Sequence, residues 1–161
     1  MASLLDTIKV IVIFRGIPGS GKSTECCKFR KFCHNNRIPC QICSADNYFE
    51  NGEKYLFDKS KLAEAHDFCR DLCLKCMEKA VSVICIDNTN TTYKEMKPYL
   101  DLAKEYGYTW FLVDSGIQYA STDICHRRCV HNVPYNTIFS MANRYMSATK
   151  VIEEYLIDNY L

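Results

Sequence analysis

The sequence lacks long apolar runs, a strong net charge and repetitive or low-complexity segments. No stretch reaches the ~18 consecutive apolar residues of a membrane-spanning helix, so a membrane is not an expected partner. Twenty lysines and arginines nearly balance nineteen aspartates and glutamates, and the net charge of +1 excludes a general electrostatic attraction to nucleic acid. The first ten residues lack the basic region and the small-residue cleavage site of a signal peptide, so we expect no export.

The chain has 161 residues, of which 48% are apolar and 24% are charged. This composition is typical of a soluble globular protein. The length suits one domain, residues 1–161, built around one hydrophobic core. The sequence leaves the oligomeric state open.

Eleven cysteines are the most unusual feature of the composition. Their number is odd, no export is expected, and most occupy periodic apolar positions. We therefore expect reduced thiols that act as small core residues in a reducing compartment, the cytoplasm or alternatively the nucleus. Cys40 and Cys43 lie on a predicted strand, where i and i+3 point to opposite faces and make a poor metal clip. The most zinc-like cluster, whose spacing matches no standard zinc site, is Cys125, His126, Cys129 and His131.

Predicted strands and helices alternate along the chain. Short β-branched runs predict strands over residues 9–15, 40–46, 81–87 and 108–114. Helical spacing predicts helices over 22–34, from about 58 to 80, over 92–106 with a capping box at Thr92 and Glu95, and over 118–130 and 134–156. Residues 47–58 are predicted to form a loop with a turn at Asn51-Gly52. The alternation predicts an α/β fold with a parallel sheet of about four or five strands between helices, which binds ligands beyond the carboxyl ends of its strands.

A glycine-rich segment, "GIPGSGKS", follows the first predicted strand and opens the first predicted helix. It fits the pattern GxxxxGK followed by Ser or Thr, in which backbone N–H groups and the helix dipole bind phosphate. Lys22 is expected to reach the β- and γ-phosphates, and the Ser23 hydroxyl to bind Mg²⁺. The sequence therefore predicts binding of ATP, or another nucleoside triphosphate, with Mg²⁺. The predicted nucleotide-binding residues of this segment are Gly16, Pro18, Gly19, Ser20, Gly21, Lys22, Ser23 and Thr24.

Two aspartates end predicted strands at the same edge of the sheet. Asp46 ends the second strand and could accept the proton of an attacking hydroxyl, the alternative being a turn or cap residue. Asp87 ends the third strand and could hold a Mg²⁺-bound water, the alternative being a residue that caps the turn. The short polar side chains of Thr89 and Asn90 that follow could orient a substrate or fix the turn.

Cationic candidates come late in the chain. Arg127 and Arg128 follow the fourth strand, on a helix placed to act as a lid that neutralises charge on the transferring phosphoryl group. Arg144, on the next helix, is a second-rank cationic candidate, and it could stack on the nucleotide base. His66 lies near the side of its helix that carries Leu62, where a substrate-binding histidine and a core or capping histidine remain alternatives.

Six blocks, in family order over about residues 12 to 146, carry a resemblance to a known family: "RGIPGSGKST", "SADNYF", "EAHDFC", "IDNTNTTYKEMKPY", "AKEYGY" and "RRCVHNVPYNTIFSMANRY". The chain resembles small P-loop kinases related to polynucleotide 5'-kinase, above all the kinase-like domain of the Nedd-four-binding-protein-two family. The resemblance implies a P-loop kinase fold with a helical lid and transfer of the γ-phosphate of ATP to the 5'-hydroxyl of RNA or DNA. It also implies Asp46 as general base, Arg127 or Arg128 as lid arginine, and Asp87 and Thr89 as the polar pair after the third strand.

One position departs from the family pattern. Kinases of the bacteriophage type place an arginine three residues after the base aspartate to hold the acceptor phosphate, and this chain has Phe49 there. Tyr48 and Phe49 could instead stack on a nucleobase. Two alternatives stay open: a kinase of a small acceptor (a nucleoside, sugar or coenzyme precursor), whose pocket Tyr48, Phe49 and Phe57 would build, and a nucleotide-binding adaptor without transfer activity.

Overall fold

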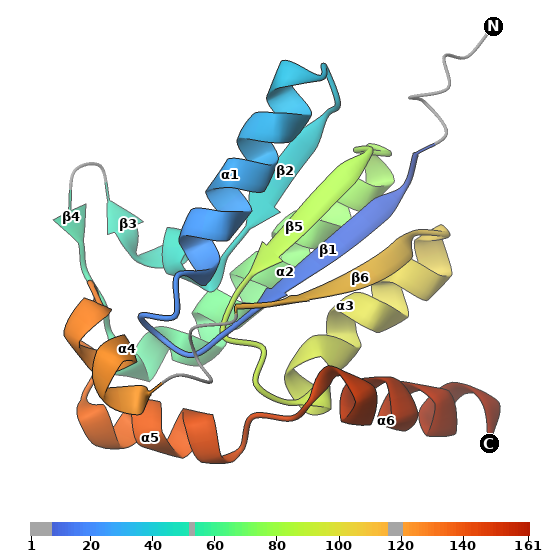
Figure 1. Ribbon diagram of the computed structural model, residues 1–161. Coiled ribbons are helices and arrows are strands. Elements are labelled where there is room, and N and C mark those ends of the chain that lie inside the picture. The colour runs from blue at the N-terminus through green and yellow to red at the C-terminus, as the bar shows by residue number, and fades with distance from the viewer. Residues whose placement is uncertain (1–7, 52–53, 116–120) are drawn as a thin grey trace, which may run out of the picture.

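A four-stranded parallel sheet forms the centre of the molecule (Figure 1). The computed structural model describes residues 8–51, 54–115 and 121–161. The sheet has the order β2 (Cys40–Cys43), β5 (Val83–Asp87), β1 (Val10–Arg15) and β6 (Thr109–Asp114). Val10 of the central strand β1 pairs with Val83 on one side and Thr109 on the other. The predicted α/β fold with a parallel sheet is confirmed.

Helices lie on both faces of the sheet and beyond its carboxyl edge (Figure 1). α1 (Lys22–Asn35) covers one face, and α2 (Leu62–Glu78) and α3 (Tyr93–Tyr106) cover the other. α4 (Thr122–Arg128) and α5 (Tyr135–Asn143) lie beyond the carboxyl ends of the strands, and α6 (Ala148–Tyr160) packs against α3. Within the described part of the chain, every helix is too short or too polar to cross a bilayer.

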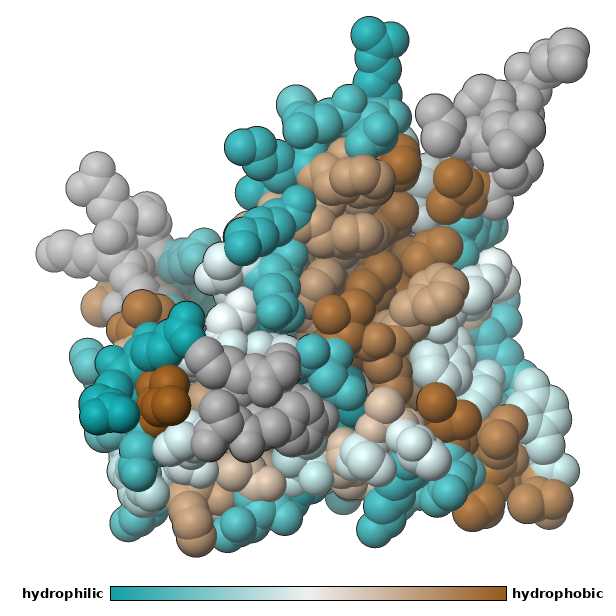
Figure 2. Space-filling model, in the orientation of Figure 1, coloured by the Kyte–Doolittle hydropathy of each residue, from teal (hydrophilic) through white to brown (hydrophobic). Residues whose placement is uncertain are grey.

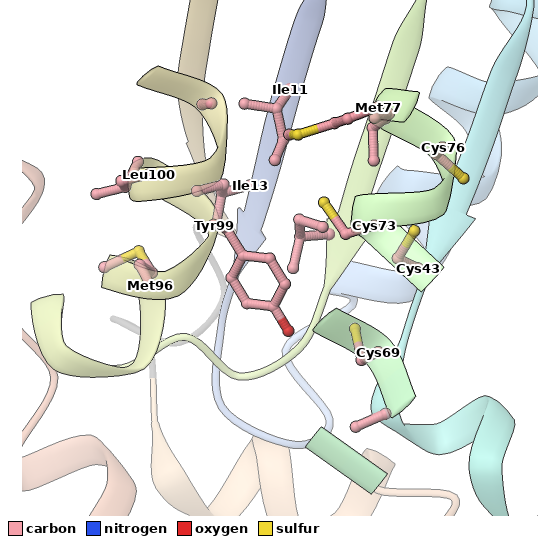
Figure 3. Packing of buried hydrophobic residues seen from close by; sticks show 14 of the residues in the cluster. Ile11, Ile13, Cys43, Cys69, Cys73, Cys76, Met77, Met96, Tyr99 and Leu100 are labelled. Atoms are coloured by element: carbon pink, nitrogen blue, oxygen red, sulfur yellow. The ribbon is translucent and has the colours of Figure 1, made fainter. Parts of the chain in front are cut away.

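The main core between the sheet and α2 and α3 is rich in sulfur (Figure 3). Ile11 and Ile13 of β1 face cysteine and methionine side chains from both helices. All eleven cysteines are free, and eight of them are buried, which confirms that they serve as small core residues. Cys43 belongs to this core, whereas Cys40 packs against the smaller core beneath α1, so the two point to opposite faces as predicted.

The two faces of the sheet are covered unequally. A band of apolar surface lies between α1 and β6 (Figure 2). Phe32 of α1 is 57% exposed, and Phe111 of β6 is 54% exposed. On the opposite face of β6, the Trp110 ring packs against Tyr155 of α6, with ring centroids 5.0 Å apart. The prediction that helices flank the sheet therefore holds for both faces of β1 and β5 but only for one face of β6.

Two predicted boundaries around the second strand were wrong. β2 ends at Cys43, and residues Ala45–Phe49 form a 3₁₀ helix, because the Ser44 hydroxyl caps it by accepting a hydrogen bond from the Asp46 N–H. The predicted loop that follows contains a short antiparallel hairpin of β3 (Glu50–Asn51) and β4 (Lys54–Tyr55). Gly52 of the predicted turn lies outside the described residues. The next helix starts with a 3₁₀ turn, Lys59–Lys61, before α2.

Two further predictions about helices were wrong. α3 begins after Thr92 as predicted, but no capping box forms: the Thr92 side chain makes no capping hydrogen bond, and the Glu95 carboxylate accepts from Thr91 N–H and Oγ1 (2.8 and 2.9 Å) instead. The predicted helix 134–156 is two helices, α5 and α6, because the chain between them is held extended: Met146 N–H donates to Thr91 O, and Met146 O accepts from Arg15. The first residues of the predicted helix 118–130 lie outside the described residues, and α4 occupies its centre.

Candidate functional site

The glycine-rich segment forms a tight loop between β1 and α1 at the carboxyl edge of the sheet (Figure 1). Gly19 and Gly21 have left-handed backbone angles, φ 81° and 94°, which glycine adopts without steric cost. A Cβ at Gly16 would collide with the Ser20 hydroxyl, and the Gly16 N–H donates to Thr89 O at 3.0 Å. The loop therefore needs glycine for its close contacts at Gly16 and for its backbone angles at Gly19 and Gly21.

The loop has the features of an anion site. Gly21, the N-cap of α1, offers no side-chain acceptor, so the first N–H groups of the helix are not capped by it. These N–H groups carry the positive end of the helix dipole. Among the described residues, the buried Ser20 hydroxyl has no hydrogen-bond partner. Donors without acceptors in a glycine-lined loop fit the phosphates of a nucleotide.

Lys22, Ser23 and Asp87 converge at the end of the loop. The Asp87 carboxylate oxygen Oδ1 accepts hydrogen bonds from Lys22 Nζ and Ser23 Oγ, both at 3.2 Å. The Lys22 and Asp87 side chains are only 11% and 9% exposed, so their ion pair is well shielded from water. A hydroxyl and a carboxylate are oxygen ligands of the kind that Mg²⁺ takes beside nucleotide phosphates, so these residues fit Mg²⁺. Ser23 and Asp87 lie within hydrogen-bond distance of each other, and their predicted role in holding Mg²⁺ stays a prediction.

Asn88 connects this site to Asp46. Its side-chain Oδ1 accepts the Ala45 N–H at 2.9 Å, and its Nδ2 donates to the Tyr99 hydroxyl at 3.4 Å. Burial and the neighbouring Cys69 raise the pKa of Tyr99, which keeps that phenol neutral. Because Asn88 follows Asp87 directly, one strand end positions Asp87 beside the loop and also holds the 3₁₀ turn that bears Asp46.

The segment around α4 contacts both the loop and the Asp46 turn. Ile17 of the loop packs with Cys125 of α4 and Ile138 of α5, and a Cβ at Gly19 would overlap the Cys125 carbonyl. His131 Nε2, in the connection after α4, lies 3.8 Å from Asp46 Oδ2, with side chains 38% and 43% exposed. The sequence analysis missed this pair, because His131 is 85 positions from Asp46. The presence of His131 in the family-like block that begins at Arg127 was the signal that could have pointed to it.

No group of three or more His, Cys, Asp and Glu side chains within residues 8–51, 54–115 and 121–161 is arranged to hold a metal ion. The zinc-like cluster of the sequence is spread over different environments. Cys125 is buried, Cys129 is half-buried, and the His126 ring lies edge-on to Tyr135 with centroids 5.6 Å apart.

Two predicted substrate residues, Phe49 and Asn90, are buried and do not face a substrate. Phe49 is only 5% exposed and packs between Tyr48 and Phe57, so it has no free face for a base. Asn90, 2% exposed with φ 46°, donates from Nδ2 to the carbonyls of Phe14 and Asn88, and therefore supports the backbone instead of a substrate. His66 is exposed on α2, so it is not a core histidine, and its role in substrate binding stays a prediction.

Tyr48 is the aromatic residue of the turn that remains accessible. It is half-buried, its hydroxyl donates to Glu64 at 2.6 Å, and its ring lies edge-on to Phe68. A surface hollow of about 350 Å³ beside the turn is lined by Tyr48, Phe49, Leu56, Asp58 and Lys61. Leu56 is 60% exposed, so this hollow is open to solvent.

The predicted cations take two positions. Arg127 and Arg128 are exposed on α4. Arg144, at the end of α5, donates from Nε to Thr91 Oγ1 at 3.1 Å and lies 3.7 Å from the Glu95 carboxylate. It therefore joins α5 to the start of α3, and its contact with the nucleotide base stays a prediction. In the loop itself, Pro18 is half-buried and Thr24 is exposed.

Arg15, which directly precedes the loop, is a buried cation that the sequence analysis missed. Its guanidinium donates to Asn90 O at 3.0 Å, to Asp114 Oδ1 at 2.9 Å and to Met146 O at 2.7 Å. The guanidinium also stacks on the Tyr145 ring, 4.6 Å from its centroid. Arg15 is 0% exposed, so these partners offset the cost of burying its charge. The Arg15 side chain therefore joins the ends of β1 and β6 and the segment after β5 to the connection between α5 and α6.

Comparisons with known proteins agree with this geometry. A family model described as an AAA domain matches residues 11–145. NEDD4-binding protein 2 of Homo sapiens is 33% identical over 144 residues, which is 88% of this chain and 8% of that protein. The 2',3'-cyclic-nucleotide 3'-phosphodiesterase of Pongo abelii is 29% identical over 111 residues, which is 68% of this chain and 25% of that protein. The chain therefore spans a quarter or less of the length of these relatives.

Solved structures share the fold at low sequence identity. A chain of the Pnkp1/Rnl/Hen1 RNA repair complex has a TM-score of 0.64 at 15% identity, over 91% of this chain and 46% of that one. The APS kinase CysC of Mycobacterium tuberculosis, in complex with AMPPNP and APS, has a TM-score of 0.53 at 18% identity, over 75% and 68%. A putative kinase from Chloroflexus aurantiacus has a TM-score of 0.54 at 15% identity, over 91% and 74%. The chain belongs to the AAA-domain family matched above, as a domain with the P-loop kinase-like fold.

Proposed function

We propose that the chain is an ATP-dependent phosphotransferase whose acceptor is the 5'-hydroxyl of RNA or DNA. The observation that carries this proposal is the pair of neighbours at the end of β5. Asp87 contacts Lys22 and Ser23 of the phosphate loop, and Asn88 holds the turn that bears Asp46. A phosphate site and a half-exposed carboxylate supported by one strand end suit phosphoryl transfer to a hydroxyl, which depends on positioning and electrostatics.

On the donor side, the backbone N–H groups of the loop and Lys22 bind the phosphates of ATP. Ser23 and Asp87 would hold Mg²⁺, which when bound neutralises charge on the donor phosphates. Binding of the nucleotide draws Lys22 from Asp87 toward the phosphates. The low exposure of both side chains keeps this exchange of partners away from bulk water.

On the acceptor side, Asp46 takes the proton of the attacking hydroxyl. The acceptor oxygen bonds to the γ-phosphorus as the bond between that phosphorus and the β–γ bridging oxygen breaks, and ADP leaves. General-base catalysis of this kind contributes about 10²–10⁴-fold. His131, 3.8 Å from Asp46 Oδ2, orients the carboxylate, and Arg127 or Arg128 of α4 neutralises the transferring group.

The acceptor class rests on the shape of the surface beside Asp46. The hollow next to the turn is open, with Leu56 60% and Phe57 52% exposed, which suits an acceptor that continues beyond the site better than an enclosed small molecule. The half-buried Tyr48 is the residue of the turn that could stack on the first base. The similarity to a chain of an RNA repair complex agrees with this choice.

The test is transfer of γ-labelled phosphate from ATP, with Mg²⁺, to 5'-hydroxyl oligoribonucleotides and oligodeoxyribonucleotides, beside mononucleoside 3'-phosphates. We expect labelled oligomers, and their ratio ranks RNA against DNA. Asp46→Asn should lower turnover by at least about 100-fold while ATP binding is kept. Lys22→Ala should lose both binding and transfer. Asn47→Ala, an exposed neighbour on the same turn, is the matched control and should retain activity.

The same assay separates the alternatives. Label on mononucleotides or small alcohols but not on oligomers would contradict the polynucleotide acceptor and favour a small-molecule kinase. ATP binding without transfer to any hydroxyl would contradict the enzyme and favour a nucleotide-binding adaptor.

A further inference from the structure

Three cysteines gather where α1 ends and β2 begins, at the end of the molecule away from α4 and α5 (Figure 1). The Cys40 sulfur lies 3.7 Å from the Cys85 sulfur on the neighbouring strand. Cys33, in the last turn of α1, packs in the same small core as Cys40 and Cys85. Cys33 and Cys85 are 1% and 0% exposed, whereas Cys40 is half-buried. Of the three thiols, Cys40 is the one that a small solute can reach.

The surroundings of Cys40 favour its thiolate. Hydrogen bonds from the Cys85 and Cys33 thiols and the nearby Arg30 guanidinium outweigh partial burial and lower the pKa of Cys40 to about 7. Burial and the adjacent Cys40 raise the pKa of Cys33 to about 11, and hydrogen bonding to Cys26 and Cys40 together with burial raises the pKa of Cys85. At neutral pH, Cys40 is thus the nucleophile of the group and its neighbours remain protonated donors.

The sheet register decides which neighbour can form a disulfide with Cys40. Cys40 pairs with Val83 and Ile42 pairs with Cys85, so Cys40 and Cys85 are offset by two residues on adjacent strands. From strand spacing and rise, their Cα atoms are about 8 Å apart, beyond the roughly 7 Å that a disulfide spans without backbone movement. Cys33 lies instead at a helix end, where the Ile38 N–H donates to Cys33 O and turns the chain back toward β2. A helix end can adjust more easily than the centre of a sheet.

We infer that Cys40 is a peroxide-sensitive thiol and that Cys33 resolves its oxidised form to a disulfide. The Cys40 thiolate attacks a peroxide, the O–O bond breaks, and Cys40 sulfenic acid forms as alkoxide or hydroxide leaves. The Cys33 sulfur then attacks the Cys40 sulfur, its thiol proton leaves with the hydroxyl group as water, and the S–S bond forms. The two thiols lose two electrons to the peroxide in total, and a dithiol reductant reverses the change by thiol–disulfide exchange.

The inference is tested on the full, reduced chain with hydrogen peroxide, by intact mass and by mapping of linked peptides under native conditions. We expect a loss of two hydrogens and a peptide that joins Cys33 to Cys40. The rate of Cys40 alkylation should rise with pH through a midpoint near 7, since the thiolate is the reactive form. These readouts need no phosphoryl transfer, so they are independent of the proposed function.

Serine variants identify the roles, because serine keeps a hydroxyl donor in place of each thiol. Cys33→Ser should leave a sulfenic acid on Cys40, trapped by dimedone, and no disulfide. Cys85→Ser should still form the Cys33–Cys40 disulfide, and so should Cys27→Ser, which removes an exposed cysteine on α1. Oxidation of Cys27 before Cys40, a Cys40–Cys85 disulfide, or an unchanged mass in the wild-type chain would each overturn the inference.

Discussion

The two sides of the candidate site are built in different ways. The donor side is largely local: residues 16–24 supply the loop, and Asp87 joins Lys22 and Ser23 from the end of β5. The acceptor side is assembled from afar, since Asn88 of β5 and His131 after α4 contact the turn that holds Asp46. A local site can be recognised as a motif, whereas an assembled site depends on contacts that variants can remove one at a time. The two sides should therefore respond differently to substitution.

The largest effect is expected at Arg15, the buried cation that directly precedes the loop. Arg15→Met removes the guanidinium that binds Asp114, Asn90 O and Met146 O, and should lower the free energy of unfolding by about 3–5 kcal/mol, because buried partners are left unpaired. Urea denaturation followed by circular dichroism measures the change. Arg70→Met, which removes an exposed ion pair with Asp67, is the control and should cost less than about 1 kcal/mol. Equal losses would show that the Arg15 network contributes little.

A smaller effect should distinguish the backbone strain of the loop from its contact with α4. Gly21→Ala places a Cβ in open space and should cost about 1–2 kcal/mol of stability, from its left-handed backbone alone. Gly19→Ala has a similar backbone angle, but its Cβ would overlap the Cys125 carbonyl of α4, so it should cost about 1–3 kcal/mol more. Matched urea denaturation curves test this order. Indistinguishable curves would mean that α4 does not rest on the loop in solution.

Asn88→Ala should impair the acceptor side alone. The buried Ala45 N–H loses its acceptor, which should lower stability by about 1–3 kcal/mol. Misplacement of Asp46 should lower turnover by about 10- to 100-fold, with ATP affinity unchanged in isothermal titration calorimetry. Asn47→Ala is again the matched control. A parallel loss of ATP affinity would contradict the separation of the two sides.

The smallest effect is expected at His131. Its pair with Asp46 is 3.8 Å long and more than a third exposed, so His131→Ala should lower kcat by only about two- to fivefold and leave the KM for ATP unchanged. His131→Gln, which keeps an N–H donor, should recover most of the lost turnover. His34→Ala, at an exposed position on α1, serves as the control. Equal kcat values for His131→Ala and His131→Gln would remove the positioning role.

Much of the fold and of the donor side could be predicted because their signals are local. β-Branched runs, helical spacing and the loop glycines each reflect the backbone within a few residues, and the predicted sheet and phosphate loop were found. Phe49 and Asn90 show where this reasoning ends. Both lie a few residues from predicted catalytic aspartates. Packing against Phe57 turns the Phe49 ring inward, and a hydrogen bond to the Phe14 carbonyl turns the Asn90 side chain inward. No property of either residue alone could reveal those neighbours.

The sequence by itself determined the alternation of strands and helices, the phosphate loop with Lys22 and Ser23, and the use of cysteines as core residues. Each follows from the steric and hydrogen-bonding needs of a short segment. Tertiary structure decided that Asn88 holds the Asp46 turn, that His131 faces it, that Arg15 is buried, and that the Cys40 and Cys85 sulfurs lie 3.7 Å apart. Those outcomes depend on distances between residues far apart in the chain, which only the packing of the folded sheet and helices sets.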